Sequence, residues 1–163
     1  MANQKLTALT ENESPALVDL VYSVDDPSVT PLSRKVTLQN VMELAPYYMD
    51  RGDIATSDYW TGDLTQDGTW RDLDLSSIVP AGTIAVKLRV SITHSVYNFI
   101  RFRENGNSNV INVLMCAAIV ANISNEYQGI INCDVNRVIE YYGNATADAV
   151  YVRVVGWVID TVN

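Results

Sequence analysis

The sequence predicts an all-β protein: a carboxy-terminal antiparallel β-sandwich of jelly-roll-like type, preceded by a short amino-terminal segment of strands and a helix. Two observations support this fold class. Six segments with strand character fall between residues 84 and 160, and short turns separate them. The charge is also uneven, because residues 1–80 contain 5 basic and 13 acidic side chains whereas residues 81–163 contain 6 of each. The whole net charge of −8 therefore lies in the first half of the chain, which indicates a molecule of two parts.

The length and composition exclude several classes of protein. A chain of 163 residues can form one domain with a short appendage. No basic patch is present, so binding to nucleic acid is not expected. No apolar run is long enough to span a membrane, and the amino terminus lacks the form of a signal peptide. We therefore expect a soluble protein made in a reducing cytoplasm.

The two cysteines fit a reducing compartment. Cys116 and Cys133 each lie in an apolar segment with strand character, and neither belongs to a CxxC or metal-ligand spacing. We expect buried free thiols, with a disulfide between neighbouring strands as the alternative.

The amino-terminal part, residues 1–46, contains short elements between prolines. One strand is expected at residues 17–24 and a second at 34–38, with Pro27 and Pro31 between them. Residues 39–45 are expected to form about two helical turns before Pro46. Such a piece buries too little apolar surface to fold alone, so it must dock on its own domain, a sister chain or another protein.

Residues 47–80 have the composition of a linker and sandwich edge. They are rich in Asp, Gly, Thr and aromatic residues and show no sustained period. Asp63, Asp67, Asp72 and Asp74 are interpreted as turn residues, because their spacing does not match an EF-hand calcium loop. Arg51-Gly52-Asp53 matches the tripeptide that integrins recognise, but three letters occur often by chance.

The sandwich is expected at residues 81–163. The clearest strand is 84–93, where apolar residues alternate with polar ones. Its buried face is predicted to carry Ile84, Val86, Leu88, Val90 and Ile92. A strand at 97–103 follows, with apolar groups on both faces, and Asn105-Gly106 is a pair typical of hairpin turns.

The remaining strands complete two layers. Residues 110–121 are almost wholly apolar, which favours a strand buried on both faces over a core helix. A strand covered on both faces implies a further layer, most simply another subunit. Further strands are expected at residues 127–133, 137–142 and 151–160.

Spaced runs in the amino-terminal part resemble a known family. These runs are residues 5–10 (KLTALT), 14–16 (SPA), 19–27 (DLVYSVDDP) and 33–38 (SRKVTL). They resemble the amino-terminal segment of small phage fibre and virion-attached proteins, in which this segment joins a variable distal domain to the particle. The resemblance implies an anchor whose contact residues are Leu6, Leu9, Leu17, Leu20, Val21, Tyr22, Val24, Val36 and Leu38.

A second resemblance covers the sandwich. Residues 62–82 (GDLTQDGTWRDLDLSSIVPAG), together with Val155-Gly156-Trp157, resemble small β-sandwich domains of phage fibres and spikes. Such domains usually form compact trimers. The two resemblances imply a non-enzymatic structural protein on the virion surface, synthesised in the host cytoplasm. It would be a trimeric head fibre or capsid decoration whose partners are its own copies and a capsid or tail protein.

The sequence is also compatible with two other functions. The first is a receptor-binding tail fibre tip that recognises a host surface glycan or protein through Tyr59, Trp60, Tyr141 and Tyr142. The second is a small polysaccharide hydrolase with paired carboxylates. The sequence carries no GxSxG, HExxH or phosphate-binding glycine loop, and its one histidine, His94, is expected at the surface end of a strand. We therefore predict no enzyme, no cofactor and no metal site.

Overall fold

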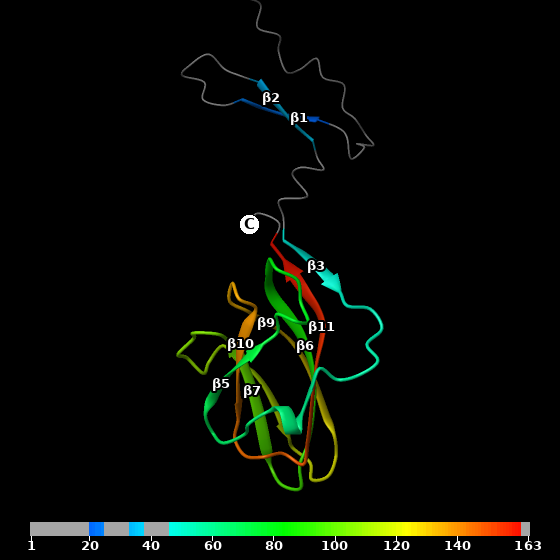
Figure 1. The fold of residues 1–163 in the computed structure, drawn as a ribbon, viewed down its shortest axis with the longest axis vertical. Helices are drawn as coiled ribbons and strands as arrows, with labels where there is room; N and C mark the ends of the chain where they lie inside the picture. The colour runs from blue at the N-terminus through cyan, green and yellow to red at the C-terminus, as the bar shows by residue number, and fades with distance from the viewer. Residues whose placement is uncertain (1–19, 25–32, 38–45, 161–163) are drawn as a thin grey trace, which may run out of the picture. The chain divides into compact units, whose positions relative to one another are not determined.

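The computed structural model describes residues 20–24, 33–37 and 46–160 (Figure 1). The chain divides into two compact units, residues 1–45 and 46–163. In the first unit, β1 (Leu20–Val24) pairs with β2 (Ser33–Thr37) in an antiparallel register that sets Leu20 opposite Thr37. The two expected amino-terminal strands are therefore confirmed, with shifted bounds. The predicted helical turns at 39–45 lie outside the described residues.

The second unit is an antiparallel β-sandwich, as predicted (Figure 1). One sheet has four strands in the order β5-β10-β7-β8, and the other has five strands, ordered β3-β11-β6-β9 with β4 also pairing with β11. The strands are β3 (Tyr47–Asp50), β4 (Tyr59–Trp60), β5 (Trp70–Asp74), β6 (Thr83–Thr93), β7 (Asn98–Glu104), β8 (Leu114–Ala118), β9 (Asn125–Asn132), β10 (Val138–Gly143) and β11 (Ala149–Ile159). One 3-10 turn, η2 (Thr61–Asp63), follows β4.

The core lies between the two sheets and follows the predicted alternation, with one exception. On β6, four of the five residues expected on the buried face are fully buried: Val86, Leu88, Val90 and Ile92. The exception is Ile84, which is exposed, whereas Thr83 and Ala85 are buried. The register with β11 slips at this point, because Ile159 pairs with Thr83 and Val158 pairs with Ala85. An irregularity of this kind leaves one residue unpaired, and it turns Ile84 away from the core.

The prediction of one strand over residues 110–121, buried on both faces, is wrong. The strand β8 covers only Leu114–Ala118, within which Cys116, Ala117 and Ala118 are buried. Apolar residues before and after β8 lie at the surface; Ile111 is 91% exposed and Ile119 is 69% exposed. An apolar run of this length therefore does not mark one buried element here, and its two ends form exposed loops.

The segment 47–80 contributes edge strands despite its lack of a period. In it, β3 and β4 pair with β11, and β5 pairs with β10. These strands are short, and Leu73 and Leu75 are the buried residues in or next to β5. Strands of two to five residues at a sheet edge are too brief to show alternation, so the sequence pattern could not reveal them.

Candidate functional site

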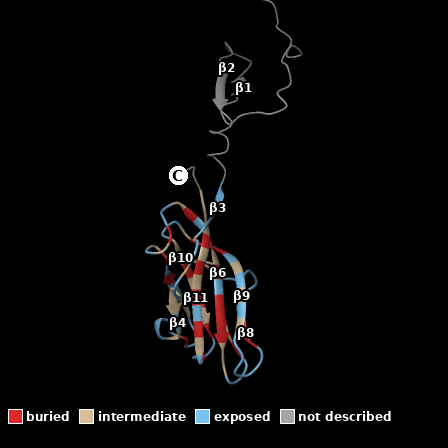
Figure 2. Cartoon of the chain, turned by 90° about the vertical axis from the view of Figure 1, so that its right-hand side faces the viewer, coloured by how far each residue is buried: buried red, intermediate tan, exposed pale blue. Residues whose placement is uncertain are grey.

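One side of the sandwich carries an unusual amount of exposed apolar surface. This side, called here the β8–β9 side, is formed by the edge strands β8 and β9 and the loops before and after β8 (Figure 2). Its exposed apolar residues are Val110, Ile111, Met115, Ile119, Val120, Ile123 and Ile130. Met115 and Ile130 face outward from different sheets, and the other five residues lie in the loops before and after β8. Isolated exposed apolar residues are normal on a protein surface, but several along one edge of a sandwich are typical of an interaction surface or an aggregation hazard.

The same side is almost without charge. Residues 105–136 contain no Lys or Arg, and Glu126 and Asp134 are their only acidic residues. Edge strands usually carry charged residues, lysine above all, which prevent pairing with other chains. The β8–β9 side therefore lacks the usual protection, and depletion of charge is the mark of the centre of a protein interface.

A cleft of about 260 Å³ opens where β8 meets β9. Leu114, Gly129 and Ile130 contribute to its lining. Gly129 permits the close approach of the two strands, because a Cβ at this position would lie 2.8 Å from Leu114 Cδ1. The Tyr127 hydroxyl donates a hydrogen bond to the Ala117 carbonyl at 2.7 Å and ties the two edges together. The surface is thus held in a fixed shape.

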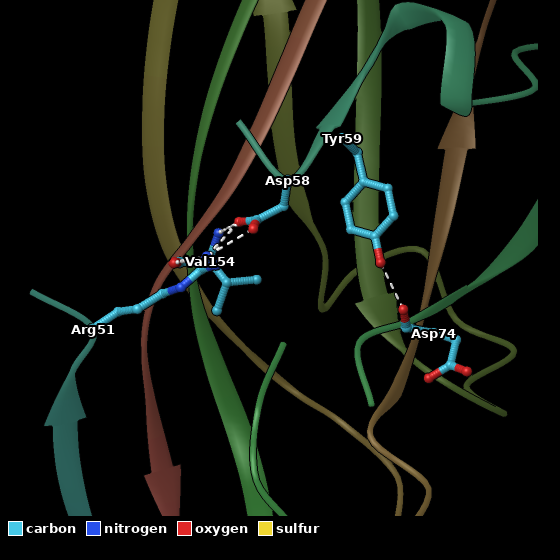
Figure 3. A network of polar contacts seen from close by, with 5 residues as sticks. All are labelled: Arg51, Asp58, Tyr59, Asp74 and Val154. Atoms are coloured by element: carbon cyan, nitrogen blue, oxygen red, sulfur yellow. Dashed lines mark hydrogen bonds and ion pairs between the residues drawn. The ribbon is translucent and has the colours of Figure 1, made fainter. Parts of the chain in front are cut away.

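The opposite side of the sandwich is closed by polar contacts. The Tyr59 hydroxyl on β4 donates a hydrogen bond of 2.6 Å to the Asp74 carbonyl at the end of β5 (Figure 3). Next to it, Arg51 pairs with Asp58, whose side chain is only 8% exposed. Arg51 also donates to the Val154 carbonyl, and Asp58 accepts from the Val154 amide (Figure 3). The loop from β3 to β4 is therefore clamped to β11.

The clamp also bears on the Arg51-Gly52-Asp53 tripeptide. The Arg51 guanidinium is held by Asp58 at 2.6 Å and by the Val154 carbonyl at 3.0 Å. A guanidinium committed to internal partners is not free to bind an acidic site on another protein. Reading this tripeptide as an integrin-binding motif therefore finds no support in the structure.

The four residues predicted to contact a ligand are not brought together at one exposed site. Trp60 is 60% exposed, and Tyr59 is half-buried with its hydroxyl bonded to Asp74. Tyr141 is a core residue, 4% exposed, and its hydroxyl accepts a hydrogen bond from the Thr65 amide. Tyr142 lies on the outer face of the four-stranded sheet between the rings of Trp70 and Phe99. A ligand contact by Tyr141 is therefore wrong for this fold, because adjacent strand residues face opposite ways.

The interpretation of the acidic residues in 63–74 as turn residues is confirmed for Asp63, Asp67 and Asp74, and it is wrong for Asp72, which lies within the strand β5 opposite Glu140. Asp63 accepts from the Trp60 amide, Asp74 accepts from the Ser76 amide, and Asp67 pairs with Arg71 at 2.6 Å. The Arg71 hydrogen bond lowers the pKa of Asp67 below its usual value. Within residues 46–160, no group of three or more His, Cys, Asp or Glu side chains is arranged to hold a metal ion.

The cysteines are free and buried, as predicted. Burial raises the pKa of the Cys116 thiol to about 12 and, together with the charge of Asp134, that of Cys133 to about 11. His94 follows β6 and is more enclosed than expected, with a side-chain exposure of 16% and its Nδ1 atom 3.1 Å from the Asp148 carboxylate. No described helix is long and apolar enough to cross a membrane.

The anchoring residues fall only partly within the described chain. Leu20, Val21, Tyr22 and Val24 lie on β1, and Val36 on β2 is opposite Val21. The other four, Leu6, Leu9, Leu17 and Leu38, lie outside the described residues.

The chain was also compared with known proteins. No protein-family model matches it, and no curated protein is significantly similar to it. Function must therefore be argued from the surfaces of this chain.

Sequence reasoning missed the β8–β9 side as an exposed surface. Apolar composition predicted a strand over residues 110–121 that is buried on both faces, with another subunit as the simplest cover, and not two exposed loops around a short strand. The signal that could have found it is the absence of Lys and Arg over residues 105–136, since a soluble sandwich normally has charges on its edge strands and loops.

Proposed function

We propose that this chain is a non-enzymatic structural protein of a bacteriophage particle. Residues 1–46 anchor it to a capsid or tail protein of the virion, and the sandwich of residues 46–163 points outward as a homotrimeric head fibre or capsid decoration. The proposal combines the resemblance of the amino-terminal runs with the division of the chain into two units.

The observation that carries the self-association is the β8–β9 side. A standard protein interface buries about 800 Å² on each partner, and its centre is apolar and poor in charge. The exposed residues of this side are of that kind, and they extend over two edge strands and two loops. A surface left uncovered in this state would promote aggregation. A second copy of the chain is the one partner that is present wherever the chain is made.

The charge distribution also supports association through this side. Residues 1–80 carry the whole net charge of −8, so copies repel one another over much of their surface. Residues 105–136, with two acidic residues and no basic ones, oppose contact far less. Charge repulsion over the acidic surface and apolar contact at the β8–β9 side both favour an interface at the β8–β9 side.

Attachment to particles tests the anchoring role. Particles that lack the protein are mixed with the full chain or with residues 46–163, sedimented, and examined for the bound protein. The full chain is expected to sediment with the particles and the truncated chain to remain in solution. Equal attachment of both chains, or absence of the protein from purified native particles by mass spectrometry, would contradict the proposal.

Salt dependence sharpens the same experiment. An acidic anchor that docks on a basic acceptor surface is weakened by screening, so attachment is expected to fall between 0.1 and about 1 M salt. Attachment that does not change with salt would show that apolar residues of the anchor, and not its charge, hold the chain.

A further inference from the structure

A second concave surface lies on the outer face of the five-stranded sheet. It is a groove of about 380 Å³ between β3 with the loop that follows it and the exposed faces of β11, β6 and β9. Its lining residues are Tyr48, Asp50, Gly52, Asp53, Ile54, Lys87, Arg89, Gln128, Arg153 and Val155. None of the four aromatic residues expected to contact a ligand is among them.

The floor of the groove gathers basic side chains in an acidic protein. Lys87 and Arg89 lie on β6, and Arg153 on β11 is directly opposite Arg89 in the register. Like charges at directly opposed positions destabilise a sheet. Only Arg89 has a carboxylate partner among the described residues, Glu126 at 2.8 Å, and Lys87 and Arg153 form no ion pair in the same part of the chain. The floor therefore holds three cations against one carboxylate, Glu126, and the Arg153 guanidinium also lies 6.0 Å from the centroid of the Tyr151 ring.

The wall of the groove supplies an aromatic ring and hydrogen-bond acceptors. Tyr48 is 45% exposed, and it lies over Gly156, where a Cβ would overlap the tyrosine hydroxyl. The glycine thus lets the ring lie against the sheet while part of it remains open to solvent. Asp50 and Asp53 add carboxylates on the same wall, and Gln128 adds an amide from β9.

The loop that forms the wall is fastened at both of its ends. The loop after β3 is held by the Arg51–Asp58 pair (Figure 3). It is also held by two backbone hydrogen bonds, from the Arg51 amide to the Val155 carbonyl and from the Asp58 amide to the Val152 carbonyl. The Gly52 amide also donates to Asp50 Oδ1 at 2.7 Å, which orients that carboxylate. A preformed site loses less conformational entropy on binding than a mobile loop does.

We infer that this groove binds an acidic oligosaccharide. A sugar ring has an apolar face that fits the Tyr48 ring, and hydroxyls that donate to Asp50 and Asp53. Its carboxylate pairs with Lys87 and Arg153. A simple phosphate or sulfate has no apolar face for the Tyr48 ring, and a neutral sugar has no charged group to pair with the basic floor. The inference rests on the groove alone and does not depend on a virion role or on the oligomeric state.

Calorimetric titration of the full chain tests the inference with four probes. The acidic probes are trigalacturonate and sialyllactose, and the matched controls are neutral trigalactose and inorganic phosphate. At least one acidic probe is expected to bind with a dissociation constant in the millimolar range or tighter, and at least tenfold more tightly than either control. Binding by neither acidic probe at millimolar concentration overturns the inference, as does equal binding of the neutral sugar or of phosphate.

Variants then locate the site. Arg153→Gln and Tyr48→Ala are each expected to weaken binding of the acidic probe about tenfold, which corresponds to about 1.4 kcal/mol. Arg71→Gln and Trp60→Ala remove a comparable exposed cation and exposed ring outside the groove and should leave binding unchanged. Thermal unfolding shows that each variant is folded. Full binding by folded Arg153→Gln and Tyr48→Ala proteins would place the ligand elsewhere and overturn the assignment.

Discussion

The two open sides of the sandwich differ in the charged residues and hydrogen bonds at their edge strands. On one side, β3, β4 and β5 are bordered by Asp50, Arg51, Asp58 and Asp74, and a hydrogen bond from Tyr59 joins the two sheets. On the β8–β9 side, the exposed residues are aliphatic or uncharged polar apart from Glu126, and no Lys or Arg occurs over residues 105–136.

The difference lies in how strongly each side opposes contact with another chain. A charged edge with satisfied hydrogen bonds is stable in water and repels other strands. An edge with few charges and exposed apolar residues allows other chains to associate with it. The same fold thus carries one side suited to solvent and one side suited to a partner, and each can be altered without rebuilding the core.

The largest expected effect on stability comes from breaking the clamp on the closed side. Asp58→Ala leaves the Arg51 guanidinium and the Val154 amide without their acceptor. Removal of one partner of a buried ion pair lowers the free energy of unfolding by about 3 kcal/mol or more. We expect about 3 kcal/mol here, because Arg51 is partly exposed. Urea unfolding of residues 46–163 should show this loss.

A matched pair at the surface provides the control. Asp67→Ala removes the partner of Arg71, but both side chains are more than 40% exposed, and such pairs contribute little. This variant should unfold at nearly the same urea concentration as the parent chain. If the Asp58 and Asp67 variants lose equal stability, the clamp is not what holds the closed side.

An intermediate loss of stability is expected when the buried Cys116 thiol on β8 titrates. Burial disfavours the thiolate and raises the pKa of Cys116 in the folded chain from its ordinary value of 9.0 to about 12. The unfolded chain releases its proton first, so this contribution to stability is present below pH 9 and is lost as the pH rises from 9 toward 12. By pH 10 the loss is about 1.4 kcal/mol.

The comparison of slopes isolates this effect from other titrating groups. Unfolding of the parent chain and of Cys116→Ala is measured between pH 8 and 10.5. The variant is expected to be less stable at every pH but to lose less stability as the pH rises. Equal slopes would mean that Cys116 is not shielded from solvent behind β8.

The smallest loss of stability is expected from removal of the hydrogen bond that joins β4 to the end of β5. Tyr59→Phe removes the hydroxyl that donates to the Asp74 carbonyl, at a cost of about 1 kcal/mol. Tyr151→Phe removes a hydroxyl from a tyrosine that is 43% exposed, and it serves as the control. A stability change for Tyr59→Phe no larger than that for Tyr151→Phe, measured by urea unfolding, would show that the closure does not depend on this bond.

The sequence predicted the sandwich because long strands alternate clearly. Residues 84–93 and 151–160 supply the two central strands, β6 and β11, and their buried faces follow the period of two except at the irregularity beside Ile84. The edge strands β3, β4 and β5 could not be found, because they are short and their pairing is decided by β11 and β10.

The surfaces were harder to predict than the fold. An apolar run such as residues 110–121 looks the same in sequence whether its own chain or a partner covers it, so the pattern predicted a buried strand. The groove depends on residues from β3, β6, β9 and β11, which are far apart in the sequence. Tyr141 and Tyr142 are adjacent in the sequence, but they lie on opposite faces of one strand.

The mass of the protein in solution tests the central claim most directly, namely that copies meet through the β8–β9 side. Light scattering at micromolar concentration should report three times the 18.1 kDa of one chain. The double variant Ile111→Lys, Ile119→Lys should report a single chain, because it places charges in the uncharged side. Trp60→Lys, on the opposite side, should keep the parent mass. A parent mass near 18.1 kDa, or an unchanged oligomer in the double variant, would contradict the account.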